Sequence, residues 1–156
     1  MDKTEKLFDM ASNYCDDEDY ESGLKYYDKI LKLEPYNIYA LLDKGVTLQN
    51  MNLLQRAIKC YDLVLQLHPN NILALINKGS VLHTMKKFTL AISYYDLALQ
   101  IDRFHPMALS YKGLSLLELG KLNDALVFFK KALSIDKHYD VANIGKKTVL
   151  SIMSKN

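Results

Sequence analysis

Apolar residues recur along this sequence at spacings of three and four, the pattern of helices with one buried face. Between residues 38 and 67 the pattern predicts two helices, over about 38–51 and about 54–67. Asn37 stands before the first helix as a side chain that can cap its start, Asn71 holds the same place later, and Pro69 follows the second helix. No stretch shows the clear alternation of a strand. The chain is therefore predicted to be helical.

The same pattern returns every 34 residues. LLDKGVTL at 41–48 reappears as LINKGSVL at 75–82 and as LSYKGLSL at 109–116. The positions that keep this interval are Leu41, Leu75 and Leu109; Gly45, Gly79 and Gly113; Ala57, Ala91 and Ala125; Tyr61, Tyr95 and Phe129; and, one interval earlier, Leu7, Ala11, Gly23 and Tyr27. A fixed period is the signature of a repeat architecture, and it divides the chain into repeats of about 4–37, 38–71, 72–105 and 106–139.

Other residues indicate where helices begin and end. Pro106 fits the first turn of a helix, where its missing N–H has no cost. Gly120 marks a turn between the helices of one repeat, and Asn52 and Lys86 hold the same position less favourably. The tail is predicted to be a helix over about 140–153 that starts with a cap at Asp140 and covers the packing face of the last repeat.

Helix pairs of 34 residues with small, large and proline residues at these positions resemble the tetratricopeptide repeat (TPR) family, in which each repeat is a helix–turn–helix. The resemblance covers nearly the whole chain. It implies an all-α fold, a right-handed superhelical solenoid of four repeats plus a C-terminal capping helix, as one domain over residues 1–156. The departures from the family pattern are Leu7, Leu41, Leu75 and Leu109, where tryptophan is common, and Arg103 and Lys137, where Pro35 and Pro69 stand in other repeats.

The repeated glycines need a packing reason, because glycine inside a helix costs about 1 kcal/mol relative to alanine. We expect Gly45 to let its helix approach the small Ala57 of the partner helix, and the equivalent residues to do the same. In the first repeat the arrangement is reversed, with Ala11 facing Gly23.

Each lysine before a repeated glycine follows an aspartate by sixteen residues. The expected ion pairs between neighbouring repeats are Asp28–Lys44, Asp62–Lys78 and Asp96–Lys112. The next pair would be Lys130 and Lys146, so the series should stop before the tail. The alternative is that each lysine only lays its apolar stem over the seam between repeats.

The resemblance also implies a binding surface, the concave groove that the first helices of TPR repeats line and that receives an extended or helical peptide. Helical geometry places one face of each first helix there. The implied groove residues are Phe8, Ser12, Tyr39, Leu42, Asp43, Val46, Leu73, Ile76, Asn77, His83, Met107, Ser110, Leu114 and Leu117. Apolar residues dominate and no lysine or arginine occurs, so we expect an apolar or amphipathic segment of another protein as the partner. The alternative is that this stripe is partly core.

Some TPR proteins clamp the terminal carboxylate of heat-shock chaperones with lysines, an arginine and asparagines. The corresponding positions here are Phe8, Ser12, Asp43, Leu73 and Asn77, or, counted from the second repeat, Leu42, Val46, Asn77, Met107 and Tyr111. Only Asn77 agrees, so no carboxylate clamp is expected.

Charge is uneven along the chain although the net charge is only +2. Residues 1–37 hold ten acidic and five basic residues, with the acid concentrated in DDEDYE at 16–21, whereas residues 106–156 hold four acidic and eight basic ones. The simplest interpretation is a solvated surface. The opposite ends also allow head-to-tail self-association, a contact that propagates rather than closes.

An enzyme is not expected. Cys15, Asp43 and His83 could supply a thiol, an orienting group and a base, but they lie on first helices of three successive repeats. With helices 8–10 Å apart, Cys15 and His83 should be about 20 Å from each other, and hydrogen bonding needs about 3 Å. The histidines in turns lack the spacing of a zinc site, and no phosphate-binding loop occurs, so neither metal nor cofactor is expected.

The expected location is the cytoplasm. The start of the chain lacks the basic and apolar regions of a signal peptide, and no run reaches the roughly 18 apolar residues of a membrane span. Cys15 and Cys60 fit no disulfide framework and suggest reduced thiols. RNA binding by the basic C-terminal half is the alternative function, because helical-hairpin repeats of similar length read single-stranded RNA. In RNA-binding repeats the positions that read the bases are polar, whereas in this chain they are apolar, which argues against RNA binding.

Overall fold

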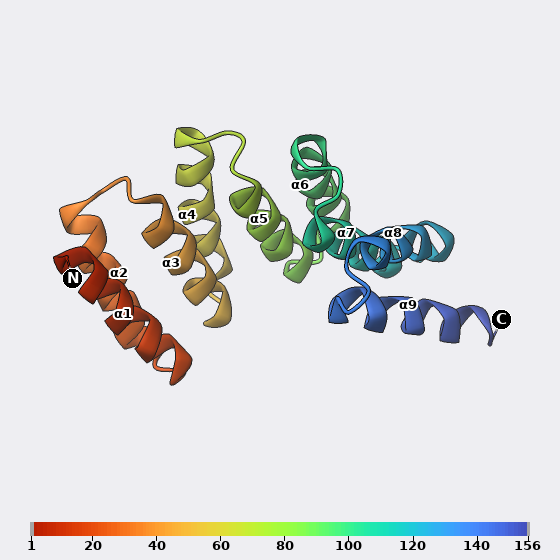
Figure 1. Ribbon diagram of the computed structural model, residues 1–156, viewed down its shortest axis with the longest axis horizontal. Helices are drawn as coiled ribbons and strands as arrows, with labels where there is room; N and C mark the ends of the chain where they lie inside the picture. The colour runs from red at the N-terminus through yellow and green to blue at the C-terminus, as the bar shows by residue number, and fades with distance from the viewer. Residues whose placement is uncertain (1, 156) are drawn as a thin grey trace. The chain divides into compact units, whose positions relative to one another are not determined.

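The computed structural model describes residues 2–155, and all regular secondary structure in that range is helical. The helices are α1 (Lys3–Asp16), α2 (Tyr20–Leu33), α3 (Ile38–Asn50), α4 (Leu54–Leu67), α5 (Ile72–Thr84), α6 (Phe88–Ile101), α7 (Pro106–Glu118), α8 (Leu122–Ile135) and α9 (Asp140–Met153) (Figure 1). Four helix pairs and a last single helix follow the predicted order, so the all-α prediction is confirmed.

The chain divides into two compact units. The N-terminal unit comprises the described residues up to Ala74, and the C-terminal unit those from Leu75 on. In the N-terminal unit α1 packs on α2, α2 on α3 and α3 on α4. In the C-terminal unit α6 packs on α7, α7 on α8, and α9 lies against both α7 and α8. A single domain over residues 1–156 stays a prediction, and Met1 and Asn156 lie outside the described residues.

Most of the predicted helix starts are confirmed. The side chains of Asn37 and Asn71 each accept a hydrogen bond from the backbone N–H three residues on, at 3.0 and 2.9 Å, and Pro106 lies in the first turn of α7. The predicted cap at Asp140 is wrong. Tyr139 is the capping residue without a side-chain bond, and Asp140 is the first residue of α9, where the helix dipole favours an acidic side chain.

The turn inside each helix pair contains one residue with a left-handed backbone. These residues are Glu18, Asn52, Lys86 and Gly120, with φ of 61°, 57°, 60° and 72°. They stand 34 residues apart, which confirms that Gly120 holds the position that Asn52 and Lys86 fill less favourably. A side chain in this conformation costs about 1–2 kcal/mol, a cost that glycine avoids.

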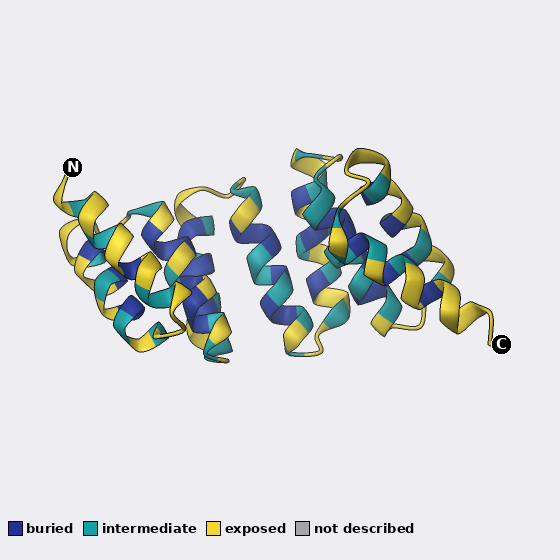
Figure 2. Cartoon of the chain, turned by 60° about the horizontal axis from the view of Figure 1, so that its bottom comes forward, coloured by how far each residue is buried: buried dark blue, intermediate teal, exposed yellow. Residues whose placement is uncertain are grey.

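Buried residues line the faces where helices meet (Figure 2). Tyr61, Tyr95 and Phe129 are among the largest fully buried side chains, and each lies on the second helix of its repeat. A Cβ atom added to Gly45 would lie 2.5 Å from the Tyr61 ring. Gly79 and Tyr95 are related in the same way.

The predicted reason for these glycines is therefore partly wrong. They allow close approach to the second helix, but the group they approach is the aromatic ring one turn beyond the predicted alanine. In the first repeat a Cβ on Gly23 would lie 2.5 Å from Cys15 Sγ and 3.3 Å from the carbonyl oxygen of Ala11, which confirms that Ala11 and Gly23 approach each other.

The last helix, α9, covers the end of the C-terminal unit. It buries Ala142, Gly145 and Val149. A Cβ on Gly145 would overlap the ring of Phe129, and a Cβ on Gly113 would lie 2.7 Å from the same ring. Phe129 of α8 is thus held between a glycine of α7 and a glycine of α9, which identifies α9 as the predicted capping helix.

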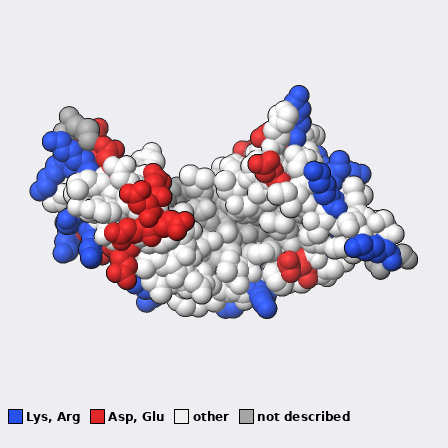
Figure 3. Space-filling view, turned by 90° about the horizontal axis from the view of Figure 1, so that it is seen from below, with Lys and Arg blue, Asp and Glu red and all other residues white. Residues whose placement is uncertain are grey.

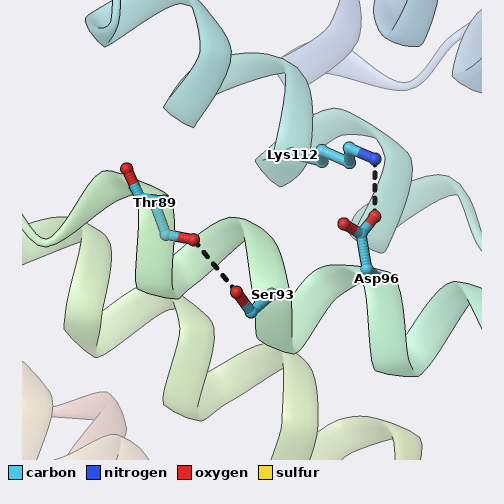
Figure 4. Close-up of polar contacts among 4 residues, drawn as sticks. All are labelled: Thr89, Ser93, Asp96 and Lys112. Atoms are coloured by element: carbon cyan, nitrogen blue, oxygen red, sulfur yellow. Dashed lines mark hydrogen bonds and ion pairs between the residues drawn. The ribbon is translucent and has the colours of Figure 1, made fainter.

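Two of the three predicted ion pairs fall within a single unit, and both of these are present. Lys44 Nζ lies 2.6 Å from Asp28 Oδ1 in the N-terminal unit. Lys112 Nζ lies 2.5 Å from Asp96 Oδ1 in the C-terminal unit, and Figure 4 shows this bond from α7 to α6 beside the bond from the Ser93 hydroxyl to the Thr89 carbonyl. The pair Asp62–Lys78 would join the two units and stays a prediction. In both observed pairs the aspartate is about half exposed, so each contributes at most about 1 kcal/mol.

Candidate functional site

The predicted groove residues of the N-terminal unit lie on α1, α3 and the start of α5. Tyr39 is 74% exposed and Leu73 49% exposed, while Ser12, Asp43 and Val46 are also exposed. Phe8 is half-buried, with its ring 6.3 Å from that of Tyr27 in an edge-on contact. Tyr39 and Leu73 are therefore the large apolar side chains of this set that a partner could reach most easily.

An open hollow of about 720 Å³ connects Tyr39 and Leu73. Its lining residues are Ile38, Tyr39, Leu42, Leu67, His68, Pro69, Asn70, Asn71 and Leu73. None of them carries an acid, a lysine or an arginine. The sequence analysis missed the part of this wall formed by the end of α4 and the turn to α5. A usable signal was the apolar residue that closes the second helix of every repeat: Leu33, Leu67, Ile101 and Ile135.

The N-terminal ends of α3 and α5 place the main side chains that line this hollow. Asn37 and Asn71 begin α3 and α5 with the same side-chain cap, which places Tyr39 and Leu73 in equivalent first turns. Pro69 follows the end of α4 at Leu67 and reinforces it, although α6 and α8 end at the equivalent residue without a proline. The two walls are therefore fixed by local sequence.

Three predicted groove residues are buried, although one of them, Leu42, still lines the hollow of Tyr39 and Leu73. They are Leu42, Ile76 and Ser110, which hold one position in successive repeats. In the C-terminal unit α9 packs against α7, the helix that carries Ser110, and the Ser110 hydroxyl donates to the carbonyl of Pro106 at 2.8 Å. At the same position in α9, Ile144 is 65% exposed. The position is thus buried in α3, α5 and α7, half-buried at Phe8 of α1 and exposed in α9.

The other predicted residues of the C-terminal unit are half-buried: Asn77, His83, Met107, Leu114 and Leu117. Two of them, His83 and Leu114, line a hollow of about 220 Å³ with Ser80, Tyr95 and Tyr111. The rings of Tyr95 and Tyr111 meet edge-on at 6.1 Å. The sequence analysis did not assign either tyrosine to the site, because Tyr95 repeats as a core position.

Burial sets the chemistry of this smaller hollow. His83 Nδ1 is 2.8 Å from Ser115 Oγ, and its ring meets Phe88 edge-on at 5.1 Å. Burial lowers the pKa of His83, against the opposing charge of Glu118, and burial raises the pKa of Tyr95. At neutral pH both side chains are therefore uncharged, and the hollow can accept one side chain with hydrogen-bonding groups.

Within the described part of the chain, no group of three histidine, cysteine, aspartate or glutamate side chains could hold a metal ion. Among the same residues, no helix combines the length and the apolar character needed to cross a bilayer. Cys15 Sγ lies 3.4 Å from the Thr47 hydroxyl, so its immediate partner is a neutral side chain.

Solved structures with this arrangement of helices include MamA from Desulfovibrio magneticus RS-1, at 24% identity and a TM-score of 0.76, with 99% of this chain and 93% of that chain covered. A thermophilic TPR protein of Thermus thermophilus has a TM-score of 0.85 at 14% identity, with 96% and 82% covered. The first TPR domain of Spaghetti (RPAP3), bound to an HSP90 peptide, has a TM-score of 0.70 at 24% identity, with 75% and 93% covered. At these identities the likeness shows the fold.

A search of curated protein sequences finds no match. A family model described as tetratricopeptide repeat matches residues 38–71, 72–105 and 112–139, more than half of the chain. The first two ranges coincide with the second and third repeats expected from the sequence, and α1 and α2 form a further pair with the same left-handed turn residue. The chain belongs to the tetratricopeptide repeat family.

Proposed function

We propose that this chain is a non-catalytic scaffold or adaptor, and that the hollow of its N-terminal unit holds an apolar or amphipathic segment of another protein. The observation that carries the proposal is the lining of that hollow, which holds no acid, lysine or arginine, with Tyr39 largely exposed and Leu73 half exposed. Exposed apolar surface of this kind marks interaction sites. Family membership supports the general role, since TPR repeats are helical modules for binding proteins.

The hollow also has polar groups that could bond a peptide backbone. Leu42 supplies a buried apolar floor, while His68 and Asn70 bring donors and acceptors to the turn beside it. Apolar pockets with a few placed polar groups are the usual form of a recognition site. A partner segment would place one or two apolar side chains between Tyr39 and Leu73.

Matched substitutions test the proposal. Peptides that bind the chain are first selected from a random library displayed on phage, and calorimetry then compares two double variants. Tyr39→Ser with Leu73→Ser should weaken the best peptide about tenfold or more, equal to about 1.4 kcal/mol. Tyr36→Ser with Leu97→Ser is the control, because these side chains are 67% and 44% exposed but lie outside the hollow.

Circular dichroism should be unchanged in both double variants, since all four side chains are exposed. Equal affinities of the wild type and the Tyr39/Leu73 variant would reject this hollow as the binding site. Salt-dependent binding of single-stranded RNA at the affinity of the best peptide would favour the RNA-binding alternative instead.

The cytoplasm is the compartment we propose for this activity. Cys15 and Cys60 form no disulfide, and Cys60 is buried. Unpaired thiols of this kind persist in a reducing compartment. Fluorescence microscopy of the tagged chain in its native cell, with a diffuse signal as the expected result, checks this.

A further inference from the structure

A hollow of a different character lies on the C-terminal unit, between the start of α7 and the end of α8. It has a volume of about 440 Å³ and is lined by Arg103, Phe104, Leu109, Lys131, Ser134 and Ile135. These residues come from the turn between α6 and α7, from α7 and from α8. Two cations and no acidic side chain line it, so it suits an anionic group.

Aromatic contacts hold the two cations in place. The Arg103 guanidinium carbon lies 4.5 Å from the centre of the exposed Phe104 ring. Lys131 Nζ lies 5.1 Å from the centre of the Phe128 ring. The buried Leu109 adds an apolar side chain to the lining. A cation stacked on an aromatic ring keeps its donors for a second partner, and a guanidinium matches a carboxylate.

The same chain carries a segment of complementary charge. The turn from α1 to α2 contains Asp16, Asp17 and Glu18, all exposed, with Glu18 in the left-handed conformation. No cation among the described residues forms an ion pair with these three carboxylates. The next residue, Asp19, accepts a bond from the Ser22 backbone at 3.1 Å and so fixes the turn. Figure 3 shows acidic side chains gathered in one patch of the N-terminal unit.

We propose that the acidic turn of one copy of this chain, residues 16–19, docks into the hollow lined by Arg103 and Lys131 of a second copy. The carboxylates of the turn would meet the two cations, and the half-buried ring of Tyr20 would extend the apolar contact toward Phe104 and Ile135. The two surfaces differ, so the contact is head-to-tail and adds further copies. This inference rests on the proposed scaffold function and deepens it by naming one partner, at a surface separate from the hollow of Tyr39 and Leu73.

Sedimentation velocity with charge-reversed variants tests the contact. At about 0.02 M salt, where screening is weak, the wild type should sediment as species larger than the 17.9 kDa monomer, and at about 0.5 M salt as the monomer. Arg103→Glu with Lys131→Glu should lower the association constant at least tenfold at low salt, and so should Asp17→Lys with Glu18→Lys. Lysine is tolerated at position 18, since Lys86 has the same backbone conformation at the equivalent position.

Matched controls make the test specific. Lys130→Glu with Lys137→Glu changes the charge of the same unit equally at exposed residues outside the hollow, and should leave association within twofold of wild type. Mixing the two reversed variants should restore association, because the reversed turn then meets the reversed hollow. A wild type that stays monomeric at low salt, or association that falls equally in the control or is not restored on mixing, would overturn the proposal. Peptide binding at Tyr39 and Leu73 is measured separately, so the scaffold function can stand when this contact fails.

Discussion

At the scale of single residues, the left-handed position in the turn of each helix pair favours glycine, yet most repeats have another residue there. Glycine fills it only at Gly120, whereas Glu18, Asn52 and Lys86 adopt the same backbone with a side chain. The sequence could predict this position, because Gly120 marks a turn and the 34-residue period places Asn52 and Lys86 at the equivalent position. It could not predict the φ values, since tertiary packing holds the strained residues in place.

Opposite substitutions at this position should have opposite effects. Lys86→Gly should raise the free energy of unfolding by up to about 1 kcal/mol, because relief of strain exceeds the added entropy of the unfolded chain. Gly120→Ala should lower it by about 1 kcal/mol, although a Cβ there would meet nothing within 4 Å. Urea unfolding measures both. A stabilised Gly120→Ala variant would show that the turn strain is not what limits stability.

His83 should make stability depend on pH. Burial lowers the pKa of His83 in the folded chain, while the unfolded chain keeps the ordinary pKa of about 6.5. As the pH falls below about 6.5 the unfolded chain binds the proton first, so stability is complete above that pH and declines toward the folded pKa. The groups around the ring, including Ser115 and Phe88, are neutral, and only Glu118 opposes the shift.

Urea unfolding of the wild type and of His83→Gln at pH values on either side of about 6.5 checks this prediction. The variant should lose less stability than the wild type on acidification. An identical pH dependence in the two proteins would mean that other groups cause any decline.

At the scale of secondary-structure elements, a glycine on the first helix and an aromatic ring on the second join each of the later helix pairs. Periodicity predicted which faces meet. It could not distinguish Ala57 from Tyr61, because residues four apart share a face and only the backbone separation decides which one makes the contact.

Gly45→Ala should therefore destabilise the fold by about 1–3 kcal/mol, through overlap with the Tyr61 ring. Tyr61→Leu removes the ring, and the double variant should be more stable than the sum of the two single effects predicts. Strictly additive free energies, measured by urea unfolding, would contradict a direct contact between these two residues.

The capping helix α9 leads to a further expectation. Deleting residues 140–156 would expose Phe129, which α9 covers at Gly145, together with the buried contacts of Ala142 and Val149. Thermal melting should shift to lower temperature, because a repeat without its neighbour exposes its packing face. Deleting only residues 154–156, beyond the end of α9, is the control and should leave the melting curve unchanged.

An unaltered melting temperature after the longer deletion would show that α9 does not stabilise the repeat that it covers.

The melting curve of the wild type also tests the prediction of a single domain, because one domain over the four repeats should melt in a single transition.

At the scale of the whole molecule, the repeat register and the family could be predicted from the sequence, because a 34-residue period needs no knowledge of side-chain contacts. The proposed binding surface could be predicted only in part. Tyr39 and Leu73 are exposed as expected, but Leu42, Ile76 and Ser110 are buried, because periodicity assigns residues to a face of a helix and not to solvent or core. Residues of the α4–α5 turn add a wall that no helical pattern describes.

Intermolecular nuclear Overhauser effects between the chain and a selected peptide are the most direct test of the proposed scaffold function. The account predicts effects from the Tyr39 ring protons and the Leu73 methyl groups to apolar side chains of the peptide, with none from Tyr36, which is similarly exposed outside the hollow. Effects confined to the outer faces of the second helices, or to the basic residues of α8, with Tyr39 and Leu73 unaffected, would contradict it.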